Sequence, residues 1–222
     1  EFNVTAFKGG NHINRLAAGD LITAEGITNP SNVSATLTVG YQIGVGKGFN
    51  PSVIQTGGTS TLALDIYNTN IAPNDQTGAS PAIIDEMPAG LQIVPGTAAT
   101  TCVGGTATSG VNGGSGLHFL RLDGGLFPAS GVCRVTAQVT SSTTGTYLNQ
   151  IPAGALRSAA GSTSPDAAEA RIRVIQHPTI TKTFNAATIP VDGVSTMTFT
   201  ISNPNSAALL PTGMNGVAFS DT

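Results

Sequence analysis

Residues 61–66 read Thr-Leu-Ala-Leu-Asp-Ile, so that large apolar side chains alternate with small or polar ones. A period of two places the leucines and the isoleucine on one face of an extended strand and their neighbours on the other. Residues 196–201, which lie 135 positions later, alternate Met, Phe and Ile with threonine in the same way. We therefore predict half-buried strands of antiparallel sheets, each with one apolar and one solvated face.

These two stretches belong to a longer repeat. Residues 14–70 align without a gap on residues 149–205, with 20 identical positions in 57. A period of this length allows each unit its own core, so the repeat indicates an array of domains and not a solenoid. Glycine-rich turns separate the strands at the spacing of a sandwich. The predicted fold class is all-β, with Ig-like antiparallel β-sandwich modules in tandem.

The offset of the repeat also predicts the boundaries of the units. Residues 1–43 are expected to close one unit, residues 44–177 to form a complete unit, and residues 178–222 to open a third. A partial unit exposes unpaired strand edges and an apolar face. We therefore expect the partial units to be completed by neighbouring repeats of a longer chain or by other copies of this chain, in a tandem array or a filament.

Composition limits the possible partners. Charged residues make up 9% of the chain, the formal net charge is −3, and the sequence contains 28 Gly and 13 Pro. Such thinly spread charge offers no basic patch for nucleic acid and no polybasic segment for anionic lipid. No apolar run has the length of a membrane helix. We expect no nucleic-acid partner, no membrane insertion in this segment and no cofactor.

Cys102 and Cys133 are the two cysteines of the chain, and both fall inside the complete unit. They could form a disulfide or remain two buried thiols. We expect the disulfide, because one pair closing one loop suits an exported domain. A metal site is not expected, since two cysteines without a histidine neighbour make a poor zinc site.

Three polar residues stand at strand positions that should point inward: Lys47, Asp85 and Asn149. Each has apolar residues two positions away, as Lys47 has Val45 and Phe49. The other copies of the repeat carry the equivalent residues Lys182, Asp221 and Asn14. A buried charge is costly unless it is paired, and desolvation drives lysine toward its neutral, nucleophilic form.

This trio has the composition that a spontaneous intramolecular isopeptide bond requires. A neutral Lys47 amine would attack the side-chain carbonyl of Asn149, a protonated Asp85 would polarise that carbonyl, and ammonia would leave. Two other interpretations remain open. Lys47 and Asp85 could form a buried ion pair, or the three residues could have unrelated roles near the surface, with the lysine extending into solvent.

Residues 182–205, 85–91 and 145–156 resemble the conserved-repeat domains of large bacterial surface proteins. The resemblance covers nearly the whole chain. It implies Ig-like sandwiches strung in tandem in the stalks of adhesins and envelope proteins. Related fimbrial shaft domains carry Lys–Asn isopeptide bonds, and this similarity gives the bond-forming roles to Lys47, Asp85 and Asn149.

The function expected from these features is structural and not enzymatic: a repeat module of an extracellular stalk, fibre or adhesin on a bacterial cell surface. The alternative is an adhesion module that binds a glycan or a protein. In that case residues 106–116, expected to form a Gly/Ser-rich loop, or residues 79–86 would contact the ligand. The scattered tyrosines and phenylalanines predict no aromatic sugar-binding platform.

Overall fold

The computed structural model describes residues 1–4, 10–39, 43–69, 74–75, 81–159, 161, 163–210 and 213–221. Every regular element in these residues is a β-strand, which confirms the all-β prediction. The central strands are β3 (Ile43–Asn50), β4 (Val53–Gln55), β5 (Thr59–Asn68), β6 (Asn74–Asp75), β7 (Ile83–Glu86), β8 (Gln92–Ile93), β9 (Ala99–Thr100), β10 (Val103–Val111), β11 (His118–Phe127), β12 (Gly131–Thr140), β13 (Gly145–Ile151) and β14 (Ala168–Ile175). The flanking strands are β1 (Gly10–Leu16), β2 (Val33–Val39), β15 (Thr179–Phe184) and β16 (Met197–Ser202).

One layer of the central sandwich is the sheet β3–β5–β12, in which all pairs are antiparallel. The two short strands β8 and β9 both pair with the outer side of β12. Leu62, Leu64 and Ile66 of β5 are completely buried, as their alternation predicts. The apolar face of this sheet therefore forms one wall of the core.

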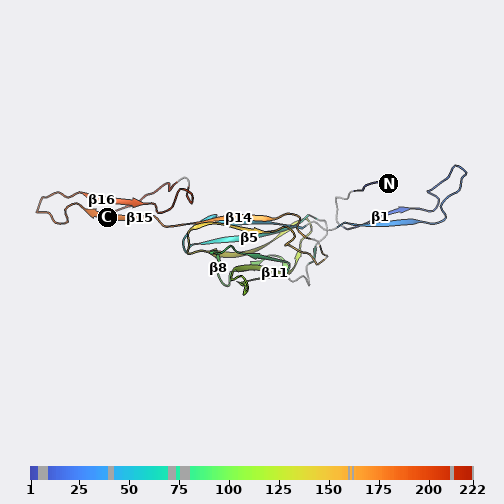
Figure 1. Cartoon of the computed structure of the whole chain (residues 1–222), viewed down its shortest axis with the longest axis horizontal. Helices are drawn as coiled ribbons and strands as arrows, with labels where there is room; N and C mark the ends of the chain where they lie inside the picture. The colour runs from blue at the N-terminus through green and yellow to red at the C-terminus, as the bar shows by residue number, and fades with distance from the viewer. Residues whose placement is uncertain are drawn as a thin grey trace.

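The remaining central strands supply the opposite wall. Strand β11 pairs with β10 on one side and with β6 and β7 on the other, while β13 and β14 form an antiparallel hairpin. Leu120 and Leu122 of β11 and Ile172 of β14 are fully buried against the same apolar cluster as the leucines of β5. The central part of the chain is thus an Ig-like β-sandwich with one continuous core (Figure 1).

One pairing departs from the antiparallel prediction, because β4 runs parallel to β14. Strands β3 and β4 follow one another in the chain but belong to different sheets. Pro51 lies between them and has no backbone N–H, so it cannot continue the ladder that β3 makes with β5. The chain turns at this point and crosses to the edge of the opposite sheet.

The two hairpins β1–β2 and β15–β16 extend from opposite ends of the sandwich (Figure 1). Their pairing repeats that of the central strands at the 135-residue offset. In β1–β2, Asn14 lies opposite Ala35, just as Asn149 lies opposite Ala170 in β13–β14. The hairpin β15–β16 corresponds in the same way to β3–β5. Both hairpins leave large apolar side chains exposed.

Candidate functional site

Lys47, Asp85 and Asn149 come from three strands that are far apart in the sequence. Lys47 is in β3, Asp85 is in β7 and Asn149 is in β13. The side chains of Lys47 and Asp85 are both 0% exposed, and Asn149 as a whole is 1% exposed. The fold thus brings the three residues together inside the sandwich, and Lys47 does not extend into solvent.

The contacts of this cluster centre on one carboxylate oxygen. Lys47 Nζ forms an ion pair and a hydrogen bond with Asp85 Oδ2. Asn149 Nδ2 donates to the same oxygen at 3.1 Å and also lies 3.4 Å from Met87 Sδ. Asp85 Oδ1 and Asn149 Oδ1 are buried without a hydrogen-bond partner among the described residues. The polar groups of the cluster are therefore only partly satisfied.

Burial moves both ionisable groups of the cluster toward their neutral forms. Desolvation lowers the pKa of Lys47 from 10.5 to about 8, although the neighbouring Asp85 opposes this shift. Desolvation also raises the pKa of Asp85 above its usual value, against the opposing effects of Lys47 and Asn149. Both shifts have the same physical cause, since a low-dielectric interior disfavours isolated charge. Each shift makes the neutral form of its group more accessible than it is in water.

A neutral amine and a carboxylic acid beside a carboxamide form a reactive group. The lysine can act as a nucleophile and the acid as a proton donor. The oxygen and nitrogen of an asparagine are distinguished by their hydrogen bonds. Rotating the Asn149 amide by half a turn would exchange the two atoms, and a protonated Asp85 would then donate to Asn149 Oδ1. In that orientation the amide carbon would be polarised toward attack.

The equivalent lysine and aspartate are also paired, but they are partly exposed. Lys182 Nζ lies 2.8 and 2.9 Å from the two carboxylate oxygens of Asp221 and 5.5 Å from the centre of the Phe199 ring. The side chains of Lys182 and Asp221 are 42% and 36% exposed. Asn14 is in β1, in the hairpin at the other end of the molecule (Figure 1). Among the described residues, the complete trio is assembled in the central sandwich alone.

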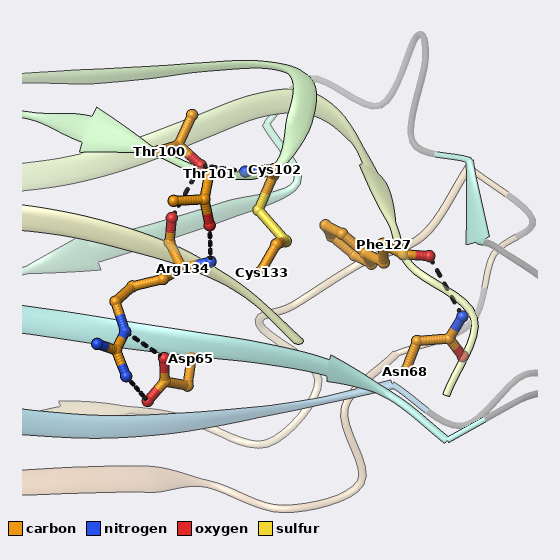
Figure 2. The surroundings of a disulfide bond; sticks show 8 residues. All are labelled: Asp65, Asn68, Thr100, Thr101, Cys102, Phe127, Cys133 and Arg134. Atoms are coloured by element: carbon orange, nitrogen blue, oxygen red, sulfur yellow. Dashed lines mark hydrogen bonds and ion pairs between the residues drawn. A yellow bond between two sulfur atoms is a disulfide. The ribbon is translucent and has the colours of Figure 1, made fainter. Parts of the chain in front are cut away.

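The predicted disulfide between Cys102 and Cys133 is present, with an S–S distance of 2.05 Å and a Cα–Cα distance of 4.9 Å. Cys102 follows β9, which pairs with β12, and directly precedes β10 in the other layer. Cys133 lies in β12 (Figure 2). The disulfide therefore joins β12 in one layer to the short segment in which the chain passes from that layer to β10 in the opposite layer.

Threonine hydrogen bonds support this crossing, and the sequence pattern did not predict them. Thr101 N–H donates to Arg134 O at 2.9 Å, and Arg134 N–H donates to Thr101 Oγ1 at 2.8 Å (Figure 2). The Arg134 guanidinium binds both carboxylate oxygens of Asp65 on β5, at 2.6 and 3.0 Å. The register of β5 on β12 places Arg134 opposite Asp65.

The two segments considered for ligand binding differ from their predicted form. Residues 103–111 form strand β10, so most of the segment 106–116 is strand and not loop. In the other segment, residues 79 and 80 lie outside the described residues, and Asp85 points into the core. A pocket of about 190 Å³ lies elsewhere, lined by Ile43, Gly44, Val45, Tyr67, Thr69, Pro165 and Asp166.

No group of three or more His, Cys, Asp or Glu residues in the described ranges could hold a metal ion. No helix within them is long and apolar enough to span a membrane.

The fold and the disulfide define an Ig-like β-sandwich protein. Residues 44–174 match the model of a family described as a domain of unknown function, DUF7933, and the chain belongs to this family. No curated protein matches the chain. Among solved structures, the chain is similar to the cohesin module of a family 33 glycoside hydrolase from Clostridium perfringens ATCC13124. That similarity has a TM-score of 0.37 and 9% identity, over 62% of this chain and 98% of the module.

Proposed function

We propose that this chain is a segment of an extracellular bacterial stalk, fibre or adhesin, made of non-enzymatic Ig-like modules in tandem. Residues 1–43, 44–177 and 178–222 belong to three successive modules. The observation that carries this proposal is the recurrence of the same strand registers at the 135-residue offset, on both sides of the central sandwich. The disulfide supports an oxidising location, because such bonds persist outside the cytosol.

A glycan- or protein-binding adhesion module is the second candidate. The pocket beside Tyr67 favours it, because an aromatic ring and the carboxylate of Asp166 both line this site. Its volume of about 190 Å³ is smaller than the roughly 300 Å³ at which small-molecule sites begin. The structural role therefore has the stronger support.

Antibodies raised against residues 44–177 test the structural proposal on the organism that makes the protein. Intact cells should bind the antibody, and brief protease treatment of whole cells should remove the signal. Electron microscopy should show gold label on projections from the cell surface. An antibody against a cytosolic enzyme serves as the control for lysis. Label that appears only in broken cells would exclude the extracellular assignment.

We further propose that the buried cluster of the central module forms an isopeptide bond. Burial, the shared Asp85 carboxyl and the unsatisfied Asn149 oxygen support this step. The neutral Lys47 Nζ attacks Asn149 Cγ, and Asp85 donates a proton to the carbonyl oxygen. Asp85 then accepts a proton from the nitrogen of Lys47 and passes it to the leaving amide nitrogen, and it takes back the first proton from the oxygen as the carbonyl re-forms. The Nζ–Cγ bond forms, the Cγ–Nδ2 bond breaks, and one ammonia is released without any redox change.

Intact mass spectrometry of the reduced 222-residue chain tests the bond directly. The wild-type mass should fall below the sequence mass by one ammonia, and digestion should release Lys47 and Asn149 in one linked peptide. Lys47→Ala, Asp85→Ala and Asn149→Ala should each restore the full mass. Lys182→Ala is the matched control and should keep the deficit. An unmodified wild-type mass in folded protein would refute the crosslink and leave a buried ion pair.

A further inference from the structure

Strand β10 is an open edge of the sandwich. It ends the strand order of its sheet and, among the described residues, pairs only with β11. It is nine residues long, whereas β8 and β9 at the edge of the other layer have two residues each. A long edge strand presents a row of unpaired backbone N–H and C=O groups, which another strand can bind.

The sequence around β10 lacks the residues that usually block such an edge. From Met87 to Leu120 the chain contains no Asp, Glu, Lys or Arg, and no proline occurs within residues 96–127. Edge strands are normally protected by charges, by proline or by bulges. The ladder with β11 has one gap, at Gly104, whose φ is 72°, but the register is the same on both sides of it, at Val103–Leu126 and at Gly105–Gly124. Residues 105–111 beyond this gap keep an uninterrupted ladder with β11, and no bulge protects the edge there.

The side chains of this segment leave space for a close neighbour. Residues 105–111 read Gly-Thr-Ala-Thr-Ser-Gly-Val, so all but the last are small. The adjoining charges on β11 neutralise one another, since Arg121 Nε and Nη2 bind the carboxylate of Asp123 at 2.7 and 2.6 Å. A second strand can therefore approach residues 105–110 without meeting a net charge or a bulky side chain on β10.

We propose that β10 pairs antiparallel with β10 of a second copy of this chain, about a two-fold axis at Thr108. An open strand edge is complementary to itself, and a neutral strand has no like-charge repulsion against its own copy. The axis places Thr108 opposite Thr108, a favourable cross-strand pair. It also places Ala107 opposite Ser109 and Thr106 opposite Gly110. The two β10–β11 sheets then form one continuous sheet across both molecules.

A contact of this size is weak for a single pair of modules, because seven small residues bury far less surface than a stable protein interface. Its effect grows when several modules of two chains lie side by side, since each further pairing becomes intramolecular. The surface therefore suits lateral association of neighbouring chains. The β10 pairing does not depend on the proposed stalk function. An experiment can therefore refute either proposal without refuting the other.

Analytical ultracentrifugation of the 222-residue chain tests the pairing. The wild type should pass reversibly from monomer to dimer, with a Kd on the order of 1 mM. Thr108→Lys should weaken the association at least about tenfold, because two ammonium groups would face each other. Equimolar Thr108→Lys and Thr108→Glu chains should recover a mixed dimer. The matched control is Thr136→Lys on β12, a strand paired on both sides at this residue.

Circular dichroism should show that the Thr108 variants remain folded. A loss of association can then be attributed to the change at the edge of β10 and not to unfolding. A wild-type chain that stays monomeric at about 1 mM would overturn the proposal. Association that Thr108→Lys leaves unchanged would also overturn it, because the contact would then lie elsewhere, as on the exposed apolar hairpins. Amide signals of residues 105–111 that shift with concentration in the wild type, and not in Thr108→Lys, would support it.

Discussion

The side chain of Lys47 shows how burial changes chemistry at the scale of one residue. A lysine in the core is stabilised by its neighbours or becomes neutral, and here the Asp85 carboxyl and burial act in opposite directions on its pKa. The two unsatisfied oxygens of Asp85 and Asn149 make the unreacted cluster a source of instability. An amide between Lys47 and Asn149 would remove the ionisable amine from the core.

The variant Asp85→Asn isolates the burial of Lys47. Both effects of Asp85 raise the pKa of Lys47, so their loss should lower this pKa below about 8. At pH values between the lowered pKa of Lys47 in the folded variant and its pKa of 10.5 in the unfolded chain, the unfolded chain holds a proton on Lys47 that the folded chain has released. The free energy of unfolding should therefore rise with pH across this window, by about 1.4 kcal/mol per unit of pKa difference.

Urea unfolding of Asp85→Asn between about pH 7 and about pH 11 measures this dependence. Asp85→Asn combined with Lys47→Met is the control, and its stability should lack the rise that Lys47 causes. If both variants give the same pH profile, the lysine is solvated in the folded state and the argument from burial fails.

At the scale of the strands, the disulfide and the threonine contacts hold the chain where it passes between layers. The bond joins residues 31 positions apart and encloses β10 and β11. A crosslink of this kind stabilises the fold mainly by restricting the unfolded chain. The threonine hydrogen bonds to Arg134 instead act on the folded state, because they need the strand register.

Replacing both Cys102 and Cys133 by alanine should lower the free energy of unfolding by roughly 3 to 4 kcal/mol, the loop-closure entropy of about 31 residues. Urea unfolding should be measured in an Asn149→Ala background, where a Lys47–Asn149 bond cannot restrict the same segment. The parent Asn149→Ala chain under reducing conditions should match the cysteine-free chain. A loss below about 1 kcal/mol would show that the unfolded chain is not restricted in this way.

At the scale of the whole molecule, side-chain hydrogen bonds of Asn205 and Arg173 connect the sandwich to the segment after β16. Asn205 Oδ1 accepts from Gln176 N–H at 2.7 Å, and Asn205 Nδ2 donates to Gln176 O at 3.0 Å. Arg173 Nη1 also reaches Leu209 O at 3.4 Å. These contacts link the segment after β16 to the connection between β14 and β15, so they limit the rotation of the hairpin on the sandwich.

Asn205→Ala should loosen this joint without unfolding the sandwich. Nitrogen-15 relaxation should give β15–β16 a shorter correlation time than the central strands, and X-ray scattering should give a broader distribution of overall dimensions. Thr183→Ala, an exposed change on β15, is the control and should behave like the wild type. Equal relaxation of hairpin and sandwich in Asn205→Ala would mean that other contacts hold the joint.

The sequence alone determined the features that depend on local periodicity. The alternation at Leu62, Leu64 and Ile66 identified a strand and its buried face, because neighbouring side chains in an extended backbone point in opposite directions. The same parity indicated that Lys47, Asp85 and Asn149 point inward. The two cysteines were paired correctly, since no other pairing within the chain is available.

Only the tertiary structure decided which inward-pointing residues meet. The contacts of Asp85 with Lys47 and Asn149 span 38 and 64 residues, and they depend on how three strands from two layers are placed. The transfer of β4 to the opposite sheet, the open edge of β10 and the Arg134–Asp65 pair depend on strand order and register in the same way. Periodicity reports the face of a strand and carries no information about its neighbour, because the neighbour is chosen by packing across the whole core.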